Sequence, residues 1–216
     1  YCATADTTKV LSNLVTAYTA GFTAQPTVNT AAHDGFTIHA TPTNNKAVKC
    51  MALGVAVPVT GGSTDTGAAN DDGKITVTDA NADVIGVSAC SGTGANAGEC
   101  GGFSVKLEDG TGTCAAAGTY VVNTVATDGS TTTITVDGDM TGSDDPDSNC
   151  QVYVIPTATE VYTPPDGLST KTVSSTNGNA PGTAGTQITD IAFTTLQSST
   201  EYNIYCATAD TPKVLS

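Results

Sequence analysis

The sequence contains no tryptophan and no arginine, and all seven of its basic residues are lysine. Charged residues make up only 13% of the chain, and the net charge is −14. Proteins that bind phosphate groups need clustered lysine and arginine side chains. The balance of charge therefore argues against nucleic acid and anionic membranes as partners.

The sequence also lacks the segments and motifs that mark a membrane span or a catalytic centre. No apolar run approaches the roughly 20 residues of a membrane-spanning helix. There is no Gly-x-Ser-x-Gly, His-Glu-x-x-His or Gly-x-x-x-x-Gly-Lys-Ser/Thr motif, and only two histidines are present. We therefore expect no membrane span and no enzymatic activity.

Threonine and glycine are abundant instead, and threonine favours short β-strands over helices. Many segments alternate apolar and polar residues or form short apolar runs between turn residues, which is typical of strands. Only Lys9–Tyr18 has apolar residues at helical spacing. We predict an essentially all-β protein. The predicted strands are 36–41, 47–53, 74–78, 84–88, 102–107, 119–125, 131–136, 151–155, 187–196 and 201–209.

One string of twelve residues occurs twice. Residues 1–12 and 205–216 differ only at Thr8 and Pro212, and the two copies lie 204 residues apart. Self-similarity at a fixed period is the mark of a repeat protein. We expect the 216 residues to be one period of a tandem repeat, with a twelve-residue overlap, from a longer periodic polypeptide.

The seven cysteines agree with this interpretation. Cys2 and Cys206 occupy the same position in the two copies of the string, so each period carries six cysteines. An even set of cysteines indicates three disulfides and an oxidising, extracellular or cell-surface setting. Cys2 is then left over, because its partner lies in another period.

The segment Ile191–Cys206 is similar to the E-to-F segment of fibronectin type III and immunoglobulin-like β-sandwiches. In those domains a leucine precedes a Thr-x-Tyr-x-Val run whose tyrosine packs into the core. The corresponding residues here are Leu196, Thr200, Tyr202 and Ile204.

This resemblance implies a sandwich formed by residues 21–59 and 160–216, with 36–41 and 47–53 as strands B and C. The family pattern contains no counterpart of the long segment between these two parts. We therefore interpret residues 60–159 as a second, disulfide-bonded β domain inserted between strands C and E.

A cysteine in strand C and another in strand F resemble the versions of this sandwich in large secreted fibre proteins of microalgae and other protists. The resemblance implies a bond between Cys50 and Cys206. The other four cysteines then pair among themselves in one of three ways, and local loop closure favours the first of these. The three possibilities are Cys90–Cys100 with Cys114–Cys150, Cys90–Cys114 with Cys100–Cys150, and Cys90–Cys150 with Cys100–Cys114.

The resemblance also assigns the duplicated string to strand G. Residues 213–216 are only the start of that strand, and Lys9–Tyr18 is its continuation one period on, so we predict a strand there in spite of the helical spacing. Residues 1–20 are expected to complete the sandwich of the preceding repeat and to pack mainly on a neighbouring copy. If residues 1–20 pair instead beside 202–209 of the same chain, a fibre built by strand continuity is no longer supported and a cell-surface adhesin becomes the favoured function.

The densest polar cluster is the acidic segment 137–147, in which Asp137, Asp139 and Asp144 offer closely spaced carboxylates. Its start partly matches a calcium-binding loop, but the twelfth position is Ser148 and not glutamate. We favour a solvated acidic loop without a metal or other cofactor. Calcium at these aspartates is the alternative.

The segment 157–165 is the best candidate for modification. No Asn-x-Ser/Thr sequence occurs in the chain, which excludes N-linked sugar, whereas threonine near proline suits O-linked sugar. The alternative is that these threonines are simply exposed strand formers. The candidate residues are Thr157, Thr159 and Thr163, with Pro164 and Pro165 beside them.

The sequence therefore favours a structural subunit of an extracellular filament, of the glycofibril or flagellar-hair type. Its partners would be copies of itself and O-linked glycans. The alternative is a cell-surface adhesin or lectin-like binding module, with calcium as its cofactor.

Overall fold

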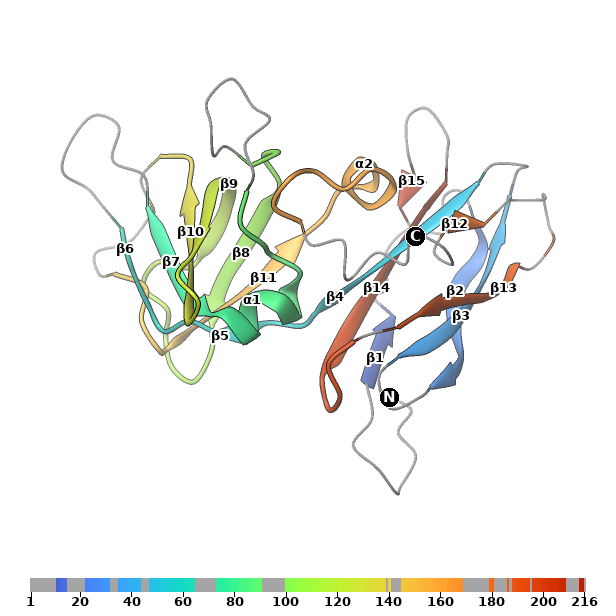
Figure 1. The fold of residues 1–216 in the computed structure, drawn as a ribbon, viewed down its shortest axis with the longest axis horizontal. Helices are drawn as coiled ribbons and strands as arrows, with labels where there is room; N and C mark the ends of the chain where they lie inside the picture. Colours follow the sequence, from blue (N-terminus) through green and yellow to red (C-terminus); the bar gives the residue numbers. More distant parts are fainter. Residues whose placement is uncertain are drawn as a thin grey trace. The chain divides into compact units, whose positions relative to one another are not determined.

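The protein is described from a computed structural model, and the chain divides into two compact units (Figure 1). Unit 1 comprises Tyr1–Gly54, Pro156–Pro164 and Thr170–Ser216, and unit 2 comprises Val55–Ile155 and Pro165–Ser169. Each unit is described by itself. The structure describes residues 11–14, 22–31, 35–43, 47–64, 73–90, 100–138, 140, 145–168, 179–180, 186, 188–194, 196–208 and 214–215.

Unit 1 contains two β-sheets. In the larger sheet the strand order is β1-β14-β4-β12, and β15 also pairs with β14; in the smaller sheet the order is β13-β3-β2. The pairing of β1 with β14 is parallel, and the other pairings in unit 1 are antiparallel. The strands are β1 (Leu11–Leu14), β2 (Phe22–Ala31), β3 (Phe36–Pro42), β4 (Val48–Gly54), β12 (Asn179–Ala180), β13 (Ile188–Phe193), β14 (Glu201–Thr208) and β15 (Val214–Leu215).

The two sheets of unit 1 share one hydrophobic core. Every second residue of β3 is buried, including Phe36, Ile38 and Ala40, as the alternation in the sequence predicts. The rings of Phe36 and Phe193, from β3 and β13, have centroids 4.9 Å apart. Tyr202 from β14 in the other sheet belongs to the same buried cluster. The sheets therefore pack face to face, and each large apolar side chain buried between them contributes about 1.5–3 kcal/mol.

A short helix, α2 (Ala158–Tyr162), packs on β4 and β14 of unit 1. The Thr157 hydroxyl accepts a hydrogen bond from the Glu160 N–H, and the Glu160 carboxylate accepts one from the Thr157 N–H. This reciprocal capping box satisfies backbone donors that the helix would otherwise leave unpaired, and Val161 anchors the helix in the core. The sequence analysis predicts no helix at these residues, so α2 is a correction to it.

Unit 2 contains one seven-stranded sheet, in the order β5-β11-β8-β9-β10-β7-β6. All its neighbouring strands are antiparallel. The predicted strands at 74–78, 102–107, 119–125, 131–136 and 151–155 all lie in this sheet, with boundaries shifted by a few residues. The strands are β5 (Val57–Pro58), β6 (Gly61–Ser63), β7 (Lys74–Thr78), β8 (Ser104–Asp109), β9 (Gly118–Thr127), β10 (Thr131–Val136) and β11 (Cys150–Ile155).

A seven-residue helix, α1 (Asp79–Ile85), follows β7 and contacts β5, β7 and β10. The Thr78 hydroxyl accepts a hydrogen bond from the Asn81 N–H at the start of the helix. Gly86 ends the helix at φ 76°, a left-handed conformation that suits glycine. The predicted strand at 84–88 is therefore wrong, because Val84 and Ile85 form the last turn of this capped helix.

The protein is mostly β, as predicted, and its described helices have only seven and five residues. Among the residues described, no helix is long and apolar enough to cross a membrane.

Three disulfides join the six described cysteines. The bond in unit 1 is Cys50–Cys206, and those in unit 2 are Cys90–Cys100 and Cys114–Cys150. These are the pairs that the sequence analysis favours. Cys2 lies outside the described residues.

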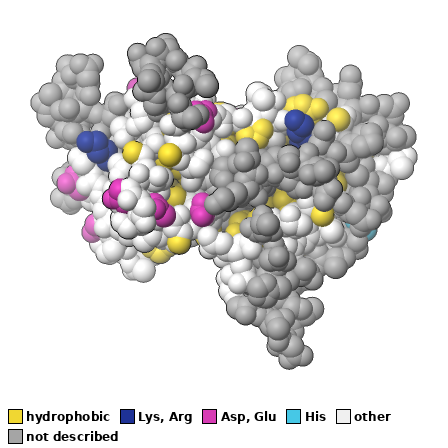
Figure 2. All heavy atoms as spheres, in the orientation of Figure 1, with side chains coloured by type: hydrophobic (Ala, Val, Ile, Leu, Met, Phe, Trp, Pro, Cys, Tyr) yellow, Lys and Arg dark blue, Asp and Glu magenta, His cyan; other side chains and the backbone are white. Residues whose placement is uncertain are grey.

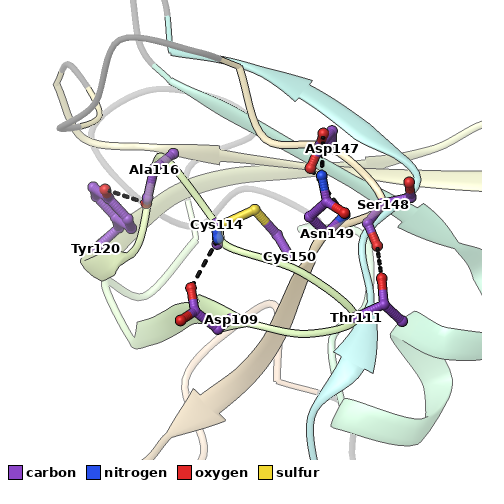
Figure 3. Close-up of a disulfide and its surroundings, with 9 residues drawn as sticks. All are labelled: Asp109, Thr111, Cys114, Ala116, Tyr120, Asp147, Ser148, Asn149 and Cys150. Atoms are coloured by element: carbon purple, nitrogen blue, oxygen red, sulfur yellow. Dashed lines mark hydrogen bonds between the residues drawn. A yellow bond between two sulfur atoms is a disulfide. The ribbon is translucent and has the colours of Figure 1, made fainter.

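Around Cys114–Cys150, the disulfide works together with nearby hydrogen bonds (Figure 3). The Cys114 N–H donates to the Asp109 carboxylate over 2.8 Å, and the Thr111 hydroxyl donates to the Ser148 carbonyl over 3.1 Å. The loop after β8 is thereby held to the turn that precedes β11.

Candidate functional site

In unit 1 both copies of the duplicated string contribute a strand to the same edge of β14. We call this the outer edge, and we call the edge that pairs with β4 the inner edge. The core-facing residues of β14 include Tyr202, Ile204 and Cys206, all buried, which fixes the strand in the sandwich. Its inner edge pairs with β4 from Tyr202 to Thr208, and Cys206 stands opposite Cys50, to which it is disulfide-bonded. Both edges of β14 carry strands, and among the described residues only the pairing on the inner edge contains a disulfide.

Two strands share the outer edge of β14, and they run in opposite directions (Figure 1). Strand β1 is parallel to β14, with Leu11 opposite Glu201 and Leu14 opposite Ile204. Strand β15 is antiparallel, with Leu215 opposite Ala207. Leu11 and Leu215 are the same position in the two copies of the twelve-residue string. Both copies of the string therefore contribute to a strand that pairs with the outer edge of β14.

This arrangement corrects the expectation for residues 1–20. They were expected to pack mainly on a neighbouring copy, but Leu11–Leu14 pairs with β14 of its own chain. The resemblance to strand G predicts the strand and assigns it to the preceding repeat, whereas in the structure an unpaired sheet edge of the same chain accepts it. The strand itself is confirmed for Leu11–Leu14, and the remainder of 1–20 lies outside the described residues.

The candidate glycosylation segment surrounds α2. Thr157, Thr159 and Thr163 are exposed, and Pro164 and Pro165 are half-buried. The Thr157 hydroxyl caps the helix, so a sugar at that oxygen would compete with the cap. Thr159 and Thr163 are thus the more accessible acceptors.

The acidic segment 137–147 is described only in part. Asp137 is exposed, whereas Asp139 and Asp144 lie outside the described residues. The Asp145 carboxylate accepts hydrogen bonds from the N–H and the hydroxyl of Thr64, over 2.8 and 3.0 Å. These bonds, the one from the N–H above all, lower the pKa of Asp145. This carboxylate therefore fastens its loop to the residue after β6.

The Asp147 carboxylate likewise serves its own turn, accepting from the backbone and side-chain amides of Asn149. Within the described ranges, no three His, Cys, Asp or Glu side chains come together in a way that could hold a metal ion.

A shallow polar depression lies beside α1 in unit 2. Asp79, Asp83, Ser88 and Thr132 are among its lining residues. The Thr132 hydroxyl donates to the Asp79 carboxylate over 2.6 Å, so this pair stabilises the contact between α1 and β10.

On the face drawn in Figure 2 acidic side chains lie at several separate positions. The Glu108 carboxylate lies 2.9 Å from the Lys106 ammonium, on the same strand. Both side chains are partly exposed, so the pair contributes little to stability.

Comparison with protein-family models, curated proteins and solved structures gave no match for this chain. Among the described residues, the outer edge of β14 is the most specific functional feature, because both copies of the duplicated string form strands there.

Proposed function

We propose that this chain is a structural subunit of an extracellular filament, built from 204-residue periods joined head to tail. The observations that carry the proposal are that the duplicated string recurs after 204 residues and that its second copy forms β15 on the outer edge of β14. A string that recurs once per period and lies on a sheet edge is placed to link one period to the next through main-chain hydrogen bonds.

We also propose that unit 1 is an immunoglobulin- or fibronectin-III-like sandwich. The sheet order β13-β3-β2 corresponds to strands E, B and A, and β15-β14-β4 corresponds to G, F and C. The Tyr202 hydroxyl accepts a hydrogen bond from the Gln197 N–H over 3.0 Å. This bond supports the assignment, because a tyrosine near the start of strand F that bonds the backbone upstream is typical of the fold.

The link between periods is heterologous, since one end of a subunit meets the other end of the next. Such contacts generate open filaments unless the rotation between subunits closes a ring. The three disulfides support an oxidising, extracellular location. O-linked sugar at Thr159 and Thr163 would then coat an exposed surface.

The second candidate is a cell-surface adhesin or lectin-like binding module. The observation in its favour is that β1 pairs with its own chain, which makes unit 1 self-contained. In that case consecutive periods would behave as independent domains.

The test compares single and linked periods. Chains carrying one, three and five periods are purified and imaged by electron microscopy, with sedimentation velocity on the same samples. The filament proposal expects straight rods whose length grows by an equal step per period. The matched control replaces Val214 and Leu215, and their equivalents at every junction, with glycine, and we expect its periods to articulate freely. Freely articulated beads with the natural junction would refute the filament and favour the adhesin.

A further inference from the structure

We infer that β1 can be displaced from the outer edge of β14. The displacing segment is residues 13–14 of a second copy of this chain, which would continue along β14 in the direction of β15. The inference rests on the proposed function, because it states how consecutive periods would be linked.

The register of β15 defines where its continuation would lie. Leu215 stands opposite Ala207 and Val214 opposite Thr208, so each further residue moves one position back along β14. The second and third residues after Leu215 would therefore face Tyr205 and Ile204.

The duplicated string supplies the sequence of that continuation. In its first copy, Val10-Leu11-Ser12 is followed by Asn13 and Leu14. A second copy of this chain whose Val10 and Leu11 take the place of β15 would put its Asn13 opposite Tyr205 and its Leu14 opposite Ile204. Within these 216 residues the shared string is continued by Asn13 and Leu14, so the partner that we propose is a second copy of this chain.

That position is already taken in the single chain. Leu14 of β1 stands opposite Ile204, in the parallel direction. One edge of a strand can form ladder hydrogen bonds with only one neighbour at each position. The chain's own β1 and the segment from a second copy therefore exclude each other.

The exchange favours the second copy for two physical reasons. Parallel pairing is slightly less stable per residue than antiparallel pairing, and the four-residue β1 would be replaced by one continuous strand in the direction of β15. A covalently attached copy also has an effective concentration on the order of millimolar. Linked periods should therefore exchange readily, whereas separate chains should remain closed by their own β1.

The experiment adds Asn-Leu-Val-Thr, the sequence of residues 13–16, directly after Ser216 of the full chain. The matched control adds Asn-Pro-Val-Thr, because proline has no backbone N–H to donate and resists strand pairing. Hydrogen exchange is followed by mass spectrometry in peptides that contain 11–14 and 201–206. Both extended chains and the unextended chain are measured as monomers.

We expect the leucine extension to lower protection of residues 11–14 by at least about tenfold while residues 201–206 stay protected. The proline extension should leave both peptides as they are in the unextended chain. Unchanged protection of 11–14 with the leucine extension would overturn the inference. So would a lack of protection at 11–14 in the unextended chain, because β1 would then not occupy the edge.

This test separates the inference from the proposed function. If β1 is displaced in the extended chain but multi-period chains articulate freely, the exchange of β1 is supported and the filament is rejected. Straight multi-period rods in which residues 11–14 of the first period remain protected would keep the filament and reject the exchange, because that segment has no preceding period to pair with.

Discussion

Removing the Cys50–Cys206 disulfide should destabilise unit 1 far more than unit 2. The perturbation is the double variant Cys50→Ala/Cys206→Ala. Both residues are fully buried and stand opposite each other on β4 and β14. Alanine fits the same space without burying a new polar group, so the principal loss is that of the covalent link.

The magnitude follows from the length of chain that the bond closes. The cysteines are 156 residues apart, which corresponds to about 5 kcal/mol of unfolding free energy in the chain-entropy treatment. If unit 2 remains folded while unit 1 unfolds, the β5–β11 pairing of Val57 with Val152 shortens the loop. Only about 60 residues then remain in it, and the expected loss is about 4 kcal/mol.

The assay is hydrogen exchange in increasing urea, read separately in peptides of β4 and β14 and in peptides of β8 and β11. The matched control is Cys114→Ala/Cys150→Ala, which makes the same chemical change at two buried positions in unit 2 and opens a loop of 36 residues. It should cost about 4 kcal/mol in unit 2. The reasoning is refuted if the Cys50–Cys206 variant lowers the stability of unit 2 as much as that of unit 1, or leaves unit 1 within about 1 kcal/mol of the parent.

Three further outcomes are expected. Thr157→Ala removes the cap of α2 and should lower the stability of unit 1 by about 1 kcal/mol in urea unfolding, whereas Thr159→Ala, exposed in the same helix, should change it by less than about 0.5 kcal/mol. Tyr202→Phe removes the acceptor of the Gln197 N–H and should cost unit 1 about 1–3 kcal/mol; an unchanged urea midpoint would argue against a structural role for the bond between the Tyr202 hydroxyl and the Gln197 N–H. The Asp128 carboxylate accepts hydrogen bonds from the backbone and hydroxyl groups of Thr131 and Ser130, and the Thr131 N–H contributes most to the lowering of its pKa. A depressed pKa in the folded state stabilises above the ordinary aspartate pKa, and the contribution is lost as pH falls through the folded value, so Asp128→Asn should flatten the acid limb of unit 2 stability in urea titrations at a series of pH values.

Most strands were predictable because one face of each is buried and the other is not. The alternation of Phe36–Thr41 identifies β3, and Tyr202, Ile204 and Cys206 identify the core face of β14, since residues two apart on a strand share a face. The disulfide pairs within unit 2 follow from short loop closure. All of these features depend on local sequence.

The two helices were not predictable from the same patterns. Val84-Ile-Gly-Val-Ser88 has the β-branched composition of a strand, but the Thr78 cap begins a helix ahead of this segment and the left-handed Gly86 ends that helix within it. Helix α2 is too short to show a period of 3.6 residues, and its capping box is the only local signal. In both segments a few capping hydrogen bonds favour a helix, although the surrounding composition does not predict one.

The position of β1 was unpredictable for a different reason. The resemblance to strand G predicts a strand at Lys9–Tyr18 in spite of the helical spacing of its apolar residues, but that apolar pattern encodes neither the direction of the strand nor the chain with which it pairs. Edge pairing depends on main-chain groups that are the same for every residue except proline. Sequence reasoning thus predicts which segments form strands, and the structure is needed to show with which strand each of them pairs.

The two edges of β14 differ in a way that suits an exchangeable link. On the inner edge, seven residues from Tyr202 to Thr208 pair with β4, and the Cys50–Cys206 bond makes that pairing covalent. On the outer edge, β1 and β15 contribute short ladders without any covalent bond to β14. A change of partner there would break a few main-chain hydrogen bonds and form others, while the disulfide keeps Tyr202 and Ile204 in the core. The strand that would receive the next period, β14, is therefore held in its own sandwich by a disulfide whichever strand occupies its outer edge.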